Sequence, residues 1–452
     1  MAILTWLFGR GDLELLWHYL GDYEALDIAV GLHDTLRFVI HGGHVVGLVQ
    51  DQALLFLTLY AALPVALIGI PTLFMGASFS LLQRAAQTDP ALVGRRVGGL
   101  QTANILGSTV GTVVTGLGLL QILGSAWTLK LLVLLGGVFP LLLMRARPSS
   151  RNVGAAAMAL ALGIAWLAPD ETTLWSRLHG SSSGDVIAAE DGSGLSVLRN
   201  HGDATSVFVN GLGQSEIPYG GGHTRLGMLP VLLHPHPRTV ALIGLGSGDT
   251  VFSASGRQET TRIDCIEIVA PQLATLRLLD ARRPYPSLKG LLGDGRIHYA
   301  FTDGRAFLLR SAARYDVVEA DALRPSSAYS GNLYSIEYFT LVRSRLNPGG
   351  YGVTWGPTAR ILETFRAVFP HVLRFDDILI GSEDPVSFDP ATVRARLQDP
   401  FTRDQYQRGG IDAAAELATL LKHPPVVYDP RSPRVGTDVN TDLFPKDEYG
   451  AK

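Results

Sequence analysis

The chain has 452 residues, of which 47% are hydrophobic and only 17% are charged, with a formal net charge of −3. Soluble domains carry about 25% charged residues, so this composition excludes a disordered chain, a collagen-like chain and a coiled-coil rod. The near-neutral charge excludes a general basic surface, so we expect no nucleic-acid partner. A single cysteine, Cys265, excludes an intrachain disulfide framework and a multi-cysteine zinc site.

The apolar residues are concentrated after the first 50 positions. Between residues 52 and 169 there are one acidic residue, Asp89, and seven basic ones. A bilayer span needs roughly 20 apolar residues, with a lower limit of about 17. Two apolar stretches pass this test easily, a third is at the limit and a fourth is short, at residues 52–75, 97–123, 128–144 and 153–168. We therefore expect an α-helical transmembrane domain at residues 51–169, in a multi-pass protein of the cell (inner) membrane that contacts lipid.

Residues 1–50 are interpreted as an amphipathic or partly membrane-embedded lead-in. The stretch 28–49 within them is apolar, but lipid exposure would be costly because it contains Asp34, Arg37, His41 and His44. The start has no basic leader and meets Arg10 and Asp12 early, so we expect no cleavable signal peptide. The competing interpretation of the apolar half is a large core of soluble helices, but successive uncharged runs are hard to bury in a soluble domain.

The sequence becomes polar after Pro169. Residues 170–191 are rich in Gly and Ser and predict a linker, and short alternating runs predict a small β unit, together spanning 170–235. A strand–helix alternation follows over 236–385, and residues 386–452 are taken as a C-terminal extension. Because such alternation gives an open, mostly parallel sheet, we expect a Rossmann-like α/β domain with strands at 239–243, 262–268, 297–300, 315–321 and 351–355.

The loop after the first of these strands carries alternating glycines, which let a backbone approach a ligand closely: Gly244, Gly246 and Gly248. About 20 residues later, Glu267 ends the next strand, where a carboxylate can accept hydrogen bonds from ribose hydroxyls. Asp249 stands where the dinucleotide pattern needs its third glycine. The loop therefore favours an adenosine ligand without a pyrophosphate, such as S-adenosylmethionine, over the alternative of an ordinary tight turn with a surface Glu.

Two further acids follow expected strands. Asp303 precedes an apolar helix start, where it could accept from an adenine amino group or simply cap the helix. Asp321 ends a strand at the edge where sites form in such sheets. A carboxylate there can accept a proton from an amine or hold a cation, and its alternative role is in a turn or cap.

These residues lie in a series of longer motifs that extends over most of the chain from about residue 59: PTLFMGASF (71–79), VGGLQTANILGSTVG (97–111), NGLGQ (210–214), LPVLLHPHP (229–237), IGLGSG (243–248), IEIV (266–269), TDGRAFL (302–308), YDVVEADALRPSSAYSGNLYSIEYF (315–339) and VNTDLFPKDEY (439–449). Together they resemble the polyamine aminopropyltransferase (spermidine synthase) family, and most closely its membrane-fused bacterial branch. The resemblance implies an S-adenosylmethionine-dependent transferase fold and a place in polyamine biosynthesis.

The resemblance also implies roles for individual residues. Asp321 falls on the family's catalytic Asp, which positions and deprotonates the attacking amine. His223 falls beside an acceptor-contacting position, and Tyr329 and Tyr334 lie on a loop that would close over the site. The nucleoside part of the donor would be surrounded by Gln214, Gly244, Gly246, Gly248, Glu267, Asp303 and Gly304.

The chain departs from the family at acidic positions. Ser247 stands where the family's Asp holds the donor's amino group, and Arg324 replaces a second active-site Asp. The family's Tyr and Glu on either side of His223 are Gly222 and Thr224. Both lost Asp side chains would bind ammonium groups, so putrescine is not the expected acceptor. A guanidinium at Arg324 favours a carboxylate, either on S-adenosylmethionine itself or on an amino-acid acceptor. The donor's own carboxylate or amine could also attack and close a ring.

We therefore expect a membrane-anchored enzyme that uses S-adenosylmethionine or its decarboxylated form as co-substrate. Displacement at the carbon next to the sulfonium would release methylthioadenosine. The alternatives are a methyltransferase on the same fold, which would release S-adenosylhomocysteine, and a nucleoside-binding module without turnover on a transporter or sensor. No metal is expected, because the histidine pairs at residues 41–44 and 234–236 have no acidic or cysteine partner nearby. The oligomeric state is left open, and a homodimer is compatible with the sequence.

The sequence gives conflicting signals about the side of the membrane on which the catalytic domain lies. Arginines cluster at residues 84–96 and 145–151, flanking an even pair of spans, so the positive-inside rule places both clusters in the cytoplasm. If residues 153–168 then cross, the catalytic domain lies outside, where S-adenosylmethionine is not made. We expect the domain on the cytoplasmic side because the co-substrate is supplied there, and the number of spans stays open.

Overall fold

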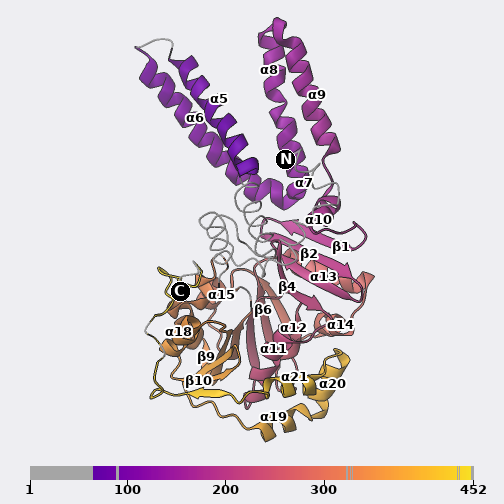
Figure 1. Ribbon diagram of the computed structural model, residues 1–452, viewed down its shortest axis with the longest axis vertical. Coiled ribbons are helices and arrows are strands. Elements are labelled where there is room, and N and C mark those ends of the chain that lie inside the picture. The colour runs from indigo at the N-terminus through magenta and orange to yellow at the C-terminus, as the bar shows by residue number, and fades with distance from the viewer. Residues whose placement is uncertain are drawn as a thin grey trace, which may run out of the picture. The chain divides into compact units, whose positions relative to one another are not determined.

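The chain divides between Gly192 and Ser193 into two compact units (Figure 1). The computed structural model describes residues 65–87, 91–321, 324, 325, 327, 329–434, 436 and 438–448. The lead-in expected at residues 1–50, with its apolar stretch 28–49, lies outside the described residues. The remaining expectations can be compared with the structure unit by unit.

The described part of the first unit consists of helices and one strand, β1 (Val186–Asp191). Its helical elements are η3 (Val65–Gly69), α5 (Ile70–Ala86), α6 (Val93–Val114), η4 (Thr115–Leu119), α7 (Leu120–Gly136), α8 (Val138–Ala146), η5 (Pro148–Ser150), α9 (Arg151–Leu167) and α10 (Glu171–Leu178). Gly124 interrupts α7 with a φ of 68°, a left-handed backbone that glycine adopts without strain. Arg84 lies in the last turn of α5, and Arg95 and Arg96 lie in the first turn of α6. Arg145 lies in the last turn of α8, and Arg151 begins α9.

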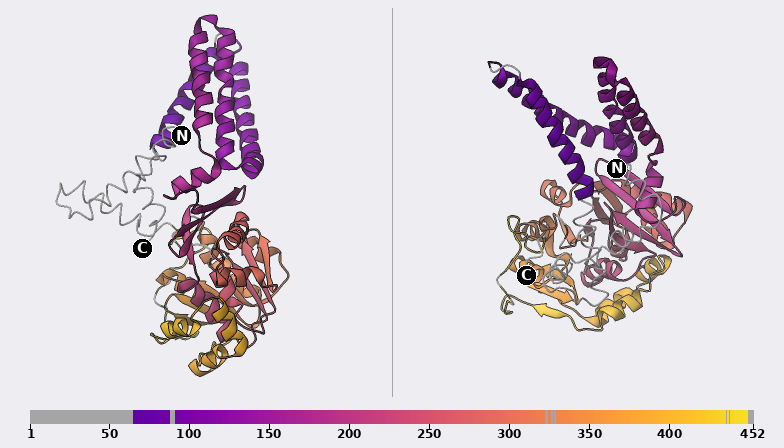
Figure 2. Two further views of the ribbon diagram at one scale, coloured as in Figure 1. Left: turned by 90° about the vertical axis from the view of Figure 1, so that its right-hand side faces the viewer. Right: turned by 45° about the horizontal axis from the view of Figure 1, so that its top comes forward.

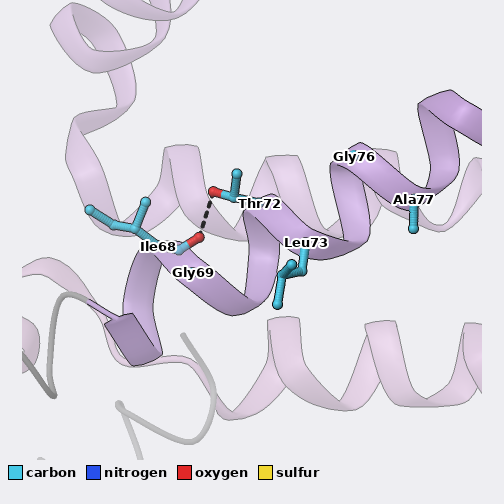
Figure 3. A pocket seen from close by; sticks show the side chains of 6 residues that line it. All are labelled: Ile68, Gly69, Thr72, Leu73, Gly76 and Ala77. Atoms are coloured by element: carbon cyan, nitrogen blue, oxygen red, sulfur yellow. Dashed lines mark hydrogen bonds between the residues drawn. The ribbon is translucent and has the colours of Figure 1, made fainter.

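The helices of the first unit expose their apolar side chains. Neither α5 nor α6 contains a buried residue, and Phe74 on α5 is 72% exposed. A surface hollow on this part of the chain is lined by apolar and small side chains, and Thr72 donates its hydroxyl proton to the Ile68 carbonyl (2.6 Å; Figure 3). Two helical stretches, Val93–Ala146 and Pro148–Leu167, are long and apolar enough to cross a membrane.

The linker expected at residues 170–191 is wrong in its secondary structure, because this segment contains α10 and β1. Asp170 caps α10, since its carboxylate accepts a hydrogen bond from the Thr173 N–H (2.8 Å). This bond satisfies one of the N–H groups that a helix start leaves unpaired. The polar composition of the segment thus reflects a capped helix and a strand rather than a structureless connection.

The second unit begins with a small β layer, as the sequence predicts. Strands β2 (Gly194–His201), β3 (Ala204–Val209) and β4 (Leu212–Ile217) pair antiparallel in chain order. Val197 pairs with Phe208, and these side chains are buried, which fixes one face of the layer inward. The layer brings β4, with Gln214 and Ser215, into the same unit as the glycine loop.

The large sheet of the second unit, parts of which are visible in Figures 1 and 2, has the strand order β12-β10-β11-β9-β8-β5-β6-β7. Its strands are β5 (Thr239–Ile243), β6 (Arg262–Glu267), β7 (Ile297–Phe301), β8 (Tyr315–Ala320), β9 (Leu346–Trp355), β10 (His371–Phe375), β11 (Ile378–Ser382) and β12 (Val426–Tyr428). The pairs from β7 to β9 are parallel, and β11, β10 and β12 add an antiparallel edge. The Rossmann-like sheet predicted from the strand–helix alternation is therefore confirmed, with an antiparallel edge that was not predicted.

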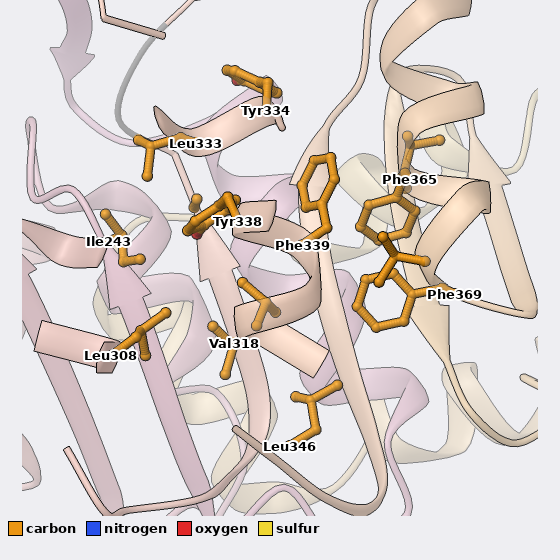
Figure 4. Packing of buried hydrophobic residues seen from close by; sticks show 14 of the residues in the cluster. Ile243, Leu308, Val318, Leu333, Tyr334, Tyr338, Phe339, Leu346, Phe365 and Phe369 are labelled. Carbon is orange, nitrogen blue, oxygen red and sulfur yellow. The ribbon is translucent and has the colours of Figure 1, made fainter. Parts of the chain in front are cut away.

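Helices connect the strands: α11 (Gly222–Leu233), α12 (Asp249–Ala254), α13 (Pro271–Arg282), α14 (Pro286–Gly293), α15 (Gly304–Arg310), α16 (Gly331–Tyr334), α17 (Ile336–Ser344), α18 (Ala359–Val368), α19 (Pro390–Leu397), α20 (Pro400–Arg408) and α21 (Ala413–Leu420). Parallel connections are right-handed, so α12 to α14 and α15 to α17 cover opposite faces. On the α15–α18 face, one buried cluster contains Ile243 and Val318 from the strands and Leu308, Tyr338 and Phe365 from the helices (Figure 4).

The direction of chain progression reverses at β5. From this strand the chain moves through β6 to β7 on one side, and β8 and β9 lie on the other. The two halves meet where the Asp321 N–H donates to the carbonyl of Ile243 (2.9 Å). Ligands bind at such switch points, outside the carboxyl ends of the strands, because the diverging connections leave a crevice there. The fold thus places the glycine loop after β5 and Asp321 after β8 at one location.

Candidate active site

The glycine loop adopts backbone conformations that require glycine. Gly246 and Gly248 have φ values of 50° and 87°. A Cβ on Gly248 would lie 2.2 Å from the Leu291 Cδ2 atom, so the close approach excludes any side chain. The N–H of Ser247 donates to the Ser215 hydroxyl (3.0 Å), and its carbonyl accepts from the hydroxyl of Tyr219 (2.8 Å). Neighbouring segments therefore hold the loop in one shape.

Glu267 lies directly against this loop. Its Oε2 accepts from the Leu245 N–H and its Oε1 from the Val269 N–H, each at 2.8 Å. The residue is only 6% exposed, and burial raises the pKa of its carboxyl group. Each carboxylate oxygen has a second lone pair, so Glu267 can order the loop and still accept from a ribose hydroxyl. Gln272 supports the same loop by donating to the Gly246 carbonyl (2.7 Å).

Asp321 is the centre of the polar cluster beyond β8. Its Oδ2 lies 2.6 Å from Nδ1 of His223 and accepts a 2.6 Å hydrogen bond from the Thr250 hydroxyl. The other ring nitrogen of His223 donates to the carbonyl of Gln214 (3.1 Å). The structure thus brings Asp321, His223 and the Gln214 backbone together from three distant segments, and it adds Thr250, which the sequence did not single out.

The two charges stabilise each other. The Asp321 carboxylate raises the pKa of His223 to about 9, against the opposing effect of burial. In return, the His223 imidazolium and the hydroxyl of Thr250 lower the pKa of Asp321, although burial acts in the other direction. At neutral pH the pair is therefore an ion pair, and Asp321 is available as a carboxylate.

This pair gives the second unit a stability that depends on pH. A His pKa that is higher in the folded state stabilises the fold fully below about 6.5, and this contribution is lost as the pH rises through about 9. We expect the melting temperature to fall between pH 7 and pH 9.5 and to fall less in His223→Gln. Thermal unfolding monitored at several pH values measures this difference, and equal pH slopes in both proteins would contradict it.

The residues expected to contact the substrate, Arg324, Tyr329 and Tyr334, lie at different distances from this cluster. Tyr334 is buried, and burial together with the Asp321 carboxylate raises the pKa of its phenol. Arg324 donates from Nη2 to the carbonyl of Gly213 (3.0 Å), which places its guanidinium beside the β4 segment that holds His223. Tyr329 is 76% exposed with a φ of 67°. Tyr334 and Arg324 thus lie near the cluster, whereas the side chain of Tyr329 is in solvent.

Asp303 and Gly304 start α15. The Asp303 carboxylate accepts from the Ala306 N–H (2.7 Å), so it caps the helix, and the residue is exposed. Gly304 is buried, and a Cβ at this position would lie 2.4 Å from the Ile243 Cγ2 atom, so the site has no room for a side chain. These contacts give both residues structural roles at the carboxyl end of β7. Their expected contact with a nucleoside stays a prediction.

Glu319 is a further acid that the sequence analysis did not single out. It lies two residues before Asp321 on β8, is 0% exposed, and neither carboxyl oxygen has a hydrogen-bond partner among the described residues. Strand register places it between Leu242 and Val353. Burial raises the pKa of Glu319 well above its usual value, and the Asp321 carboxylate raises it further. Burial thus favours the protonated form of Glu319. Its only sequence signal is its spacing of two residues from Asp321, which places both on the same face of the strand.

Glu319→Leu is expected to stabilise the second unit. Burial of an unpaired polar group costs about 1–3 kcal/mol, and for a unit of this size that corresponds to roughly 2–8 °C in melting temperature. In the unfolded chain Glu319 ionises above about pH 4.5, whereas its pKa is raised in the folded protein, so Glu319 destabilises the fold more at pH 7 than at pH 4. The increase in melting temperature on Glu319→Leu should therefore be larger at pH 7 than at pH 4. Calorimetry measures it, with Glu319→Gln as the control that keeps a buried polar group. A lower melting temperature for Glu319→Leu than for Glu319→Gln would contradict the assignment.

Comparison with known proteins agrees with this arrangement. A model described as "Spermine/spermidine synthase domain" matches residues 221–361. The polyamine aminopropyltransferase of Mycobacterium tuberculosis is 28% identical over 360 residues, which cover 71% of this chain and 66% of that protein. The one from Methanocaldococcus jannaschii is 26% identical over 218 residues, 43% of this chain and 72% of that protein. Polyamine aminopropyltransferase 2 of Pseudomonas aeruginosa is 29% identical over 164 residues, 33% of this chain and 45% of that protein.

The chain thus spans between 45% and 72% of the length of these three relatives. The crystal structure of spermidine synthase from Thermotoga maritima aligns with 50% of this chain and 88% of its own, at 17% identity and a TM-score of 0.39. The matched domain covers the glycine loop, His223 and Asp321. Residues 221–361 thus match a spermine/spermidine synthase domain, and the chain is similar to polyamine aminopropyltransferases over the ranges given above.

Proposed function

We propose that the chain is a membrane-anchored transferase that alkylates a nucleophile with S-adenosylmethionine or its decarboxylated form and releases methylthioadenosine. The observation that carries the proposal is the position of Asp321, which lies beyond β8 with His223 and Thr250 at the switch point next to the glycine loop. The names of the relatives support the reaction type, and a solved relative is described as spermidine synthase in complex with the transition-state analogue AdoDATO.

The nucleoside end of the donor would lie on the glycine loop. Leu245 and Val269 fix Glu267 beside it, so the carboxylate is already oriented when a ribose arrives. Preorganised acceptors cost little reorganisation on binding. Ser247 is 2% exposed and bonded on both sides of its peptide, so it shapes the loop through its backbone.

Asp321 would act on the nucleophile. Among contacts with described residues, both hydrogen bonds to its carboxylate end on Oδ2, so we assign Oδ1 to the attacking amine. The amine nitrogen would form a bond to the carbon next to the sulfonium as the carbon–sulfur bond breaks, and the electron pair would remain on the thioether sulfur of methylthioadenosine. The amine proton would pass to Asp321. His223 keeps this carboxylate ionised and oriented until the proton arrives.

The acceptor, or the donor itself, would carry a carboxylate. Arg324 lies next to the Gln214–His223 contact through its bond to the Gly213 carbonyl. A guanidinium binds carboxylates with paired, charge-assisted hydrogen bonds and repels a diamine. We therefore do not propose putrescine as the acceptor, and attack by the donor's own carboxylate or amine is part of the same proposal.

Product analysis tests the reaction. Purified full-length protein is incubated with either donor, with and without putrescine or amino acids, and the nucleoside products are separated. Methylthioadenosine from intact S-adenosylmethionine, without a diamine, is the expected result. Turnover only with decarboxylated donor and a diamine would contradict the proposed carboxylate and identify the enzyme as an ordinary spermidine synthase. S-Adenosylhomocysteine would identify a methyltransferase, and binding without product would identify a nucleoside-binding module.

The first unit would anchor the enzyme in a cell membrane. Exposed apolar side chains on α5 and α6 and two helical stretches of sufficient length support this proposal. We expect the chain to stay in the membrane pellet after an alkaline carbonate wash, and release into the supernatant would overturn the anchor. A reporter fused after Lys452 tests the proposed cytoplasmic side of the second unit, since it would be active on only one side of the membrane.

A further inference from the structure

Asp249 is a buried acid near the site that accepts several hydrogen bonds. It is the first residue of α12, directly after Gly248, and it is 3% exposed. Its Oδ1 accepts from the hydroxyls of Thr224 (2.6 Å) and Ser253 (3.0 Å), and its Oδ2 accepts from the Gly220 N–H (3.1 Å). One bond is made within α12, and the other two connect α12 to the start of α11.

The two bonds to the α11 segment lie on either side of His223. Gly220 precedes it by three residues, and Thr224 follows it directly. The next residue of α12, Thr250, donates to Asp321 and lies 3.3 Å from the carbonyl oxygen of His223. Two consecutive residues at the start of α12 therefore hold both partners of the His223–Asp321 pair, Asp249 through the backbone around His223 and Thr250 through the carboxylate of Asp321.

We propose that Asp249 is a positioning residue that holds the His223 imidazole against Asp321, an inference that rests on the proposed function for its effect on turnover. It does not touch the reacting atoms. Its carboxylate fixes the backbone on both sides of His223, so the side chain starts from a position where its Nδ1 reaches Asp321. Breaking one hydrogen bond of a buried charge leaves an unpaired polar group, which costs free energy, so such bonds hold their partners in place.

The charge of Asp249 adds to this effect. It contributes to the raised pKa of His223, and burial raises its own pKa to about 6. The titratable groups that act on the His223–Asp321 pair are Asp249 at the start of α12 and Tyr334 from α16. Glu319 precedes Asp321 by two residues, and the Asp321 carboxylate adds to the effect of burial in raising its pKa. Asp249 also raises the pKa of Tyr219 and Tyr406. The carboxylates of Asp321 and Asp249 therefore both favour the charged imidazole of His223.

The test is the chemical reactivity of His223 in the full-length protein. Diethyl pyrocarbonate acylates only the neutral imidazole, and mass spectrometry of the His223 peptide reports the neutral fraction at each pH. Asp249→Ala is expected to lower the pKa of His223, because it removes a nearby negative charge and releases the α11 backbone, and to raise labelling at pH 7.5 by roughly two- to tenfold. Turnover should fall by about 10–100-fold, since small misplacements of a catalytic pair have effects of this size.

Two further variants make the result decisive. Thr224→Val removes one bond to the α11 segment without changing side-chain size, and it should shift labelling in the same direction if Asp249→Ala fails to fold. Ser253→Ala removes a bond from the same carboxylate oxygen but leaves both α11 bonds intact, so it should leave His223 labelling unchanged. Unchanged labelling in folded Asp249→Ala or Thr224→Val would overturn the proposal. If the wild-type protein shows no turnover, the proposed function fails, while the labelling series still decides the role of Asp249.

Discussion

Asp321→Asn is expected to lower turnover by roughly 10²–10⁴-fold and to leave binding of methylthioadenosine within a few-fold of wild type. The substitution keeps the size of the side chain and its hydrogen bond from Thr250, but it removes the charge that can accept the amine proton. It also removes the partner of the His223 imidazolium, so the pKa of His223 should fall from about 9 toward its ordinary value. Rate measurements under saturating donor, with calorimetric binding of the nucleoside product, separate the two effects.

Asp316→Asn provides the matched control. Asp316 lies at the other end of the same strand, where its Oδ2 accepts from the backbone N–H groups of Arg238 and Thr239. The same chemical change there alters the strand but not the site, so turnover should stay close to wild type. Near-normal turnover in Asp321→Asn would show that Asp321 is structural, and an equal loss in both variants would show that the effect is on folding.

Glu267→Ala is expected to weaken binding of S-adenosylmethionine or methylthioadenosine by about one to two orders of magnitude. A charge-assisted hydrogen bond to a ribose hydroxyl is worth roughly 1.5–3 kcal/mol, and 1.4 kcal/mol is tenfold in affinity. The structure adds a second contribution, because Glu267 also accepts from the Leu245 and Val269 N–H groups that shape the loop. Calorimetry measures the affinity, and Glu383→Ala, an exposed acid paired with Arg343, is the control.

The two contributions of Glu267 can be separated with a ligand change. If the carboxylate contacts the ribose, wild-type protein should prefer methylthioadenosine to its 2′-deoxy analogue, and Glu267→Ala should lose most of this preference. If Glu267 only shapes the loop, both ligands should lose affinity equally. Unchanged affinity for both ligands in a folded variant would show that the nucleoside does not bind beside Glu267.

The parallel strands were accessible from sequence because each is a short apolar run that must be buried on both faces. The strand expected at 239–243 is β5 with the same bounds, and those expected at 262–268 and 315–321 differ from β6 and β8 by one residue. The antiparallel edge was missed. Its strands β10 and β11 come after the last strand that the sequence predicts, at 351–355, and no helix separates them, so the strand–helix spacing did not indicate them.

The local signals also determined where the polar residues of the site lie along the chain. A glycine loop after a strand and an acid at the end of a later strand are local patterns, and both occur where the sequence predicts them. Asp303 shows the weakness of such patterns, since an acid before a helix is expected equally as a cap and as a ligand. Its bond to the Ala306 N–H is the cap.

The sequence by itself determined the parallel α/β core, the glycine loop, and Asp321 at the carboxyl end of its strand, because these follow from apolar runs and turn residues that are contiguous in the chain. Only the tertiary structure decided the partners of Asp321. His223 lies 98 residues away and Thr250 lies 71 residues away, and both reach Asp321 because the strand order reverses between β5 and β8. The tertiary structure also separated Asp321 from Glu319, which lies two residues earlier on the same face of the strand. Donors from α11 and α12 favour the charged form of Asp321, whereas Glu319 lies between apolar strands without a partner among the described residues, and burial raises its pKa.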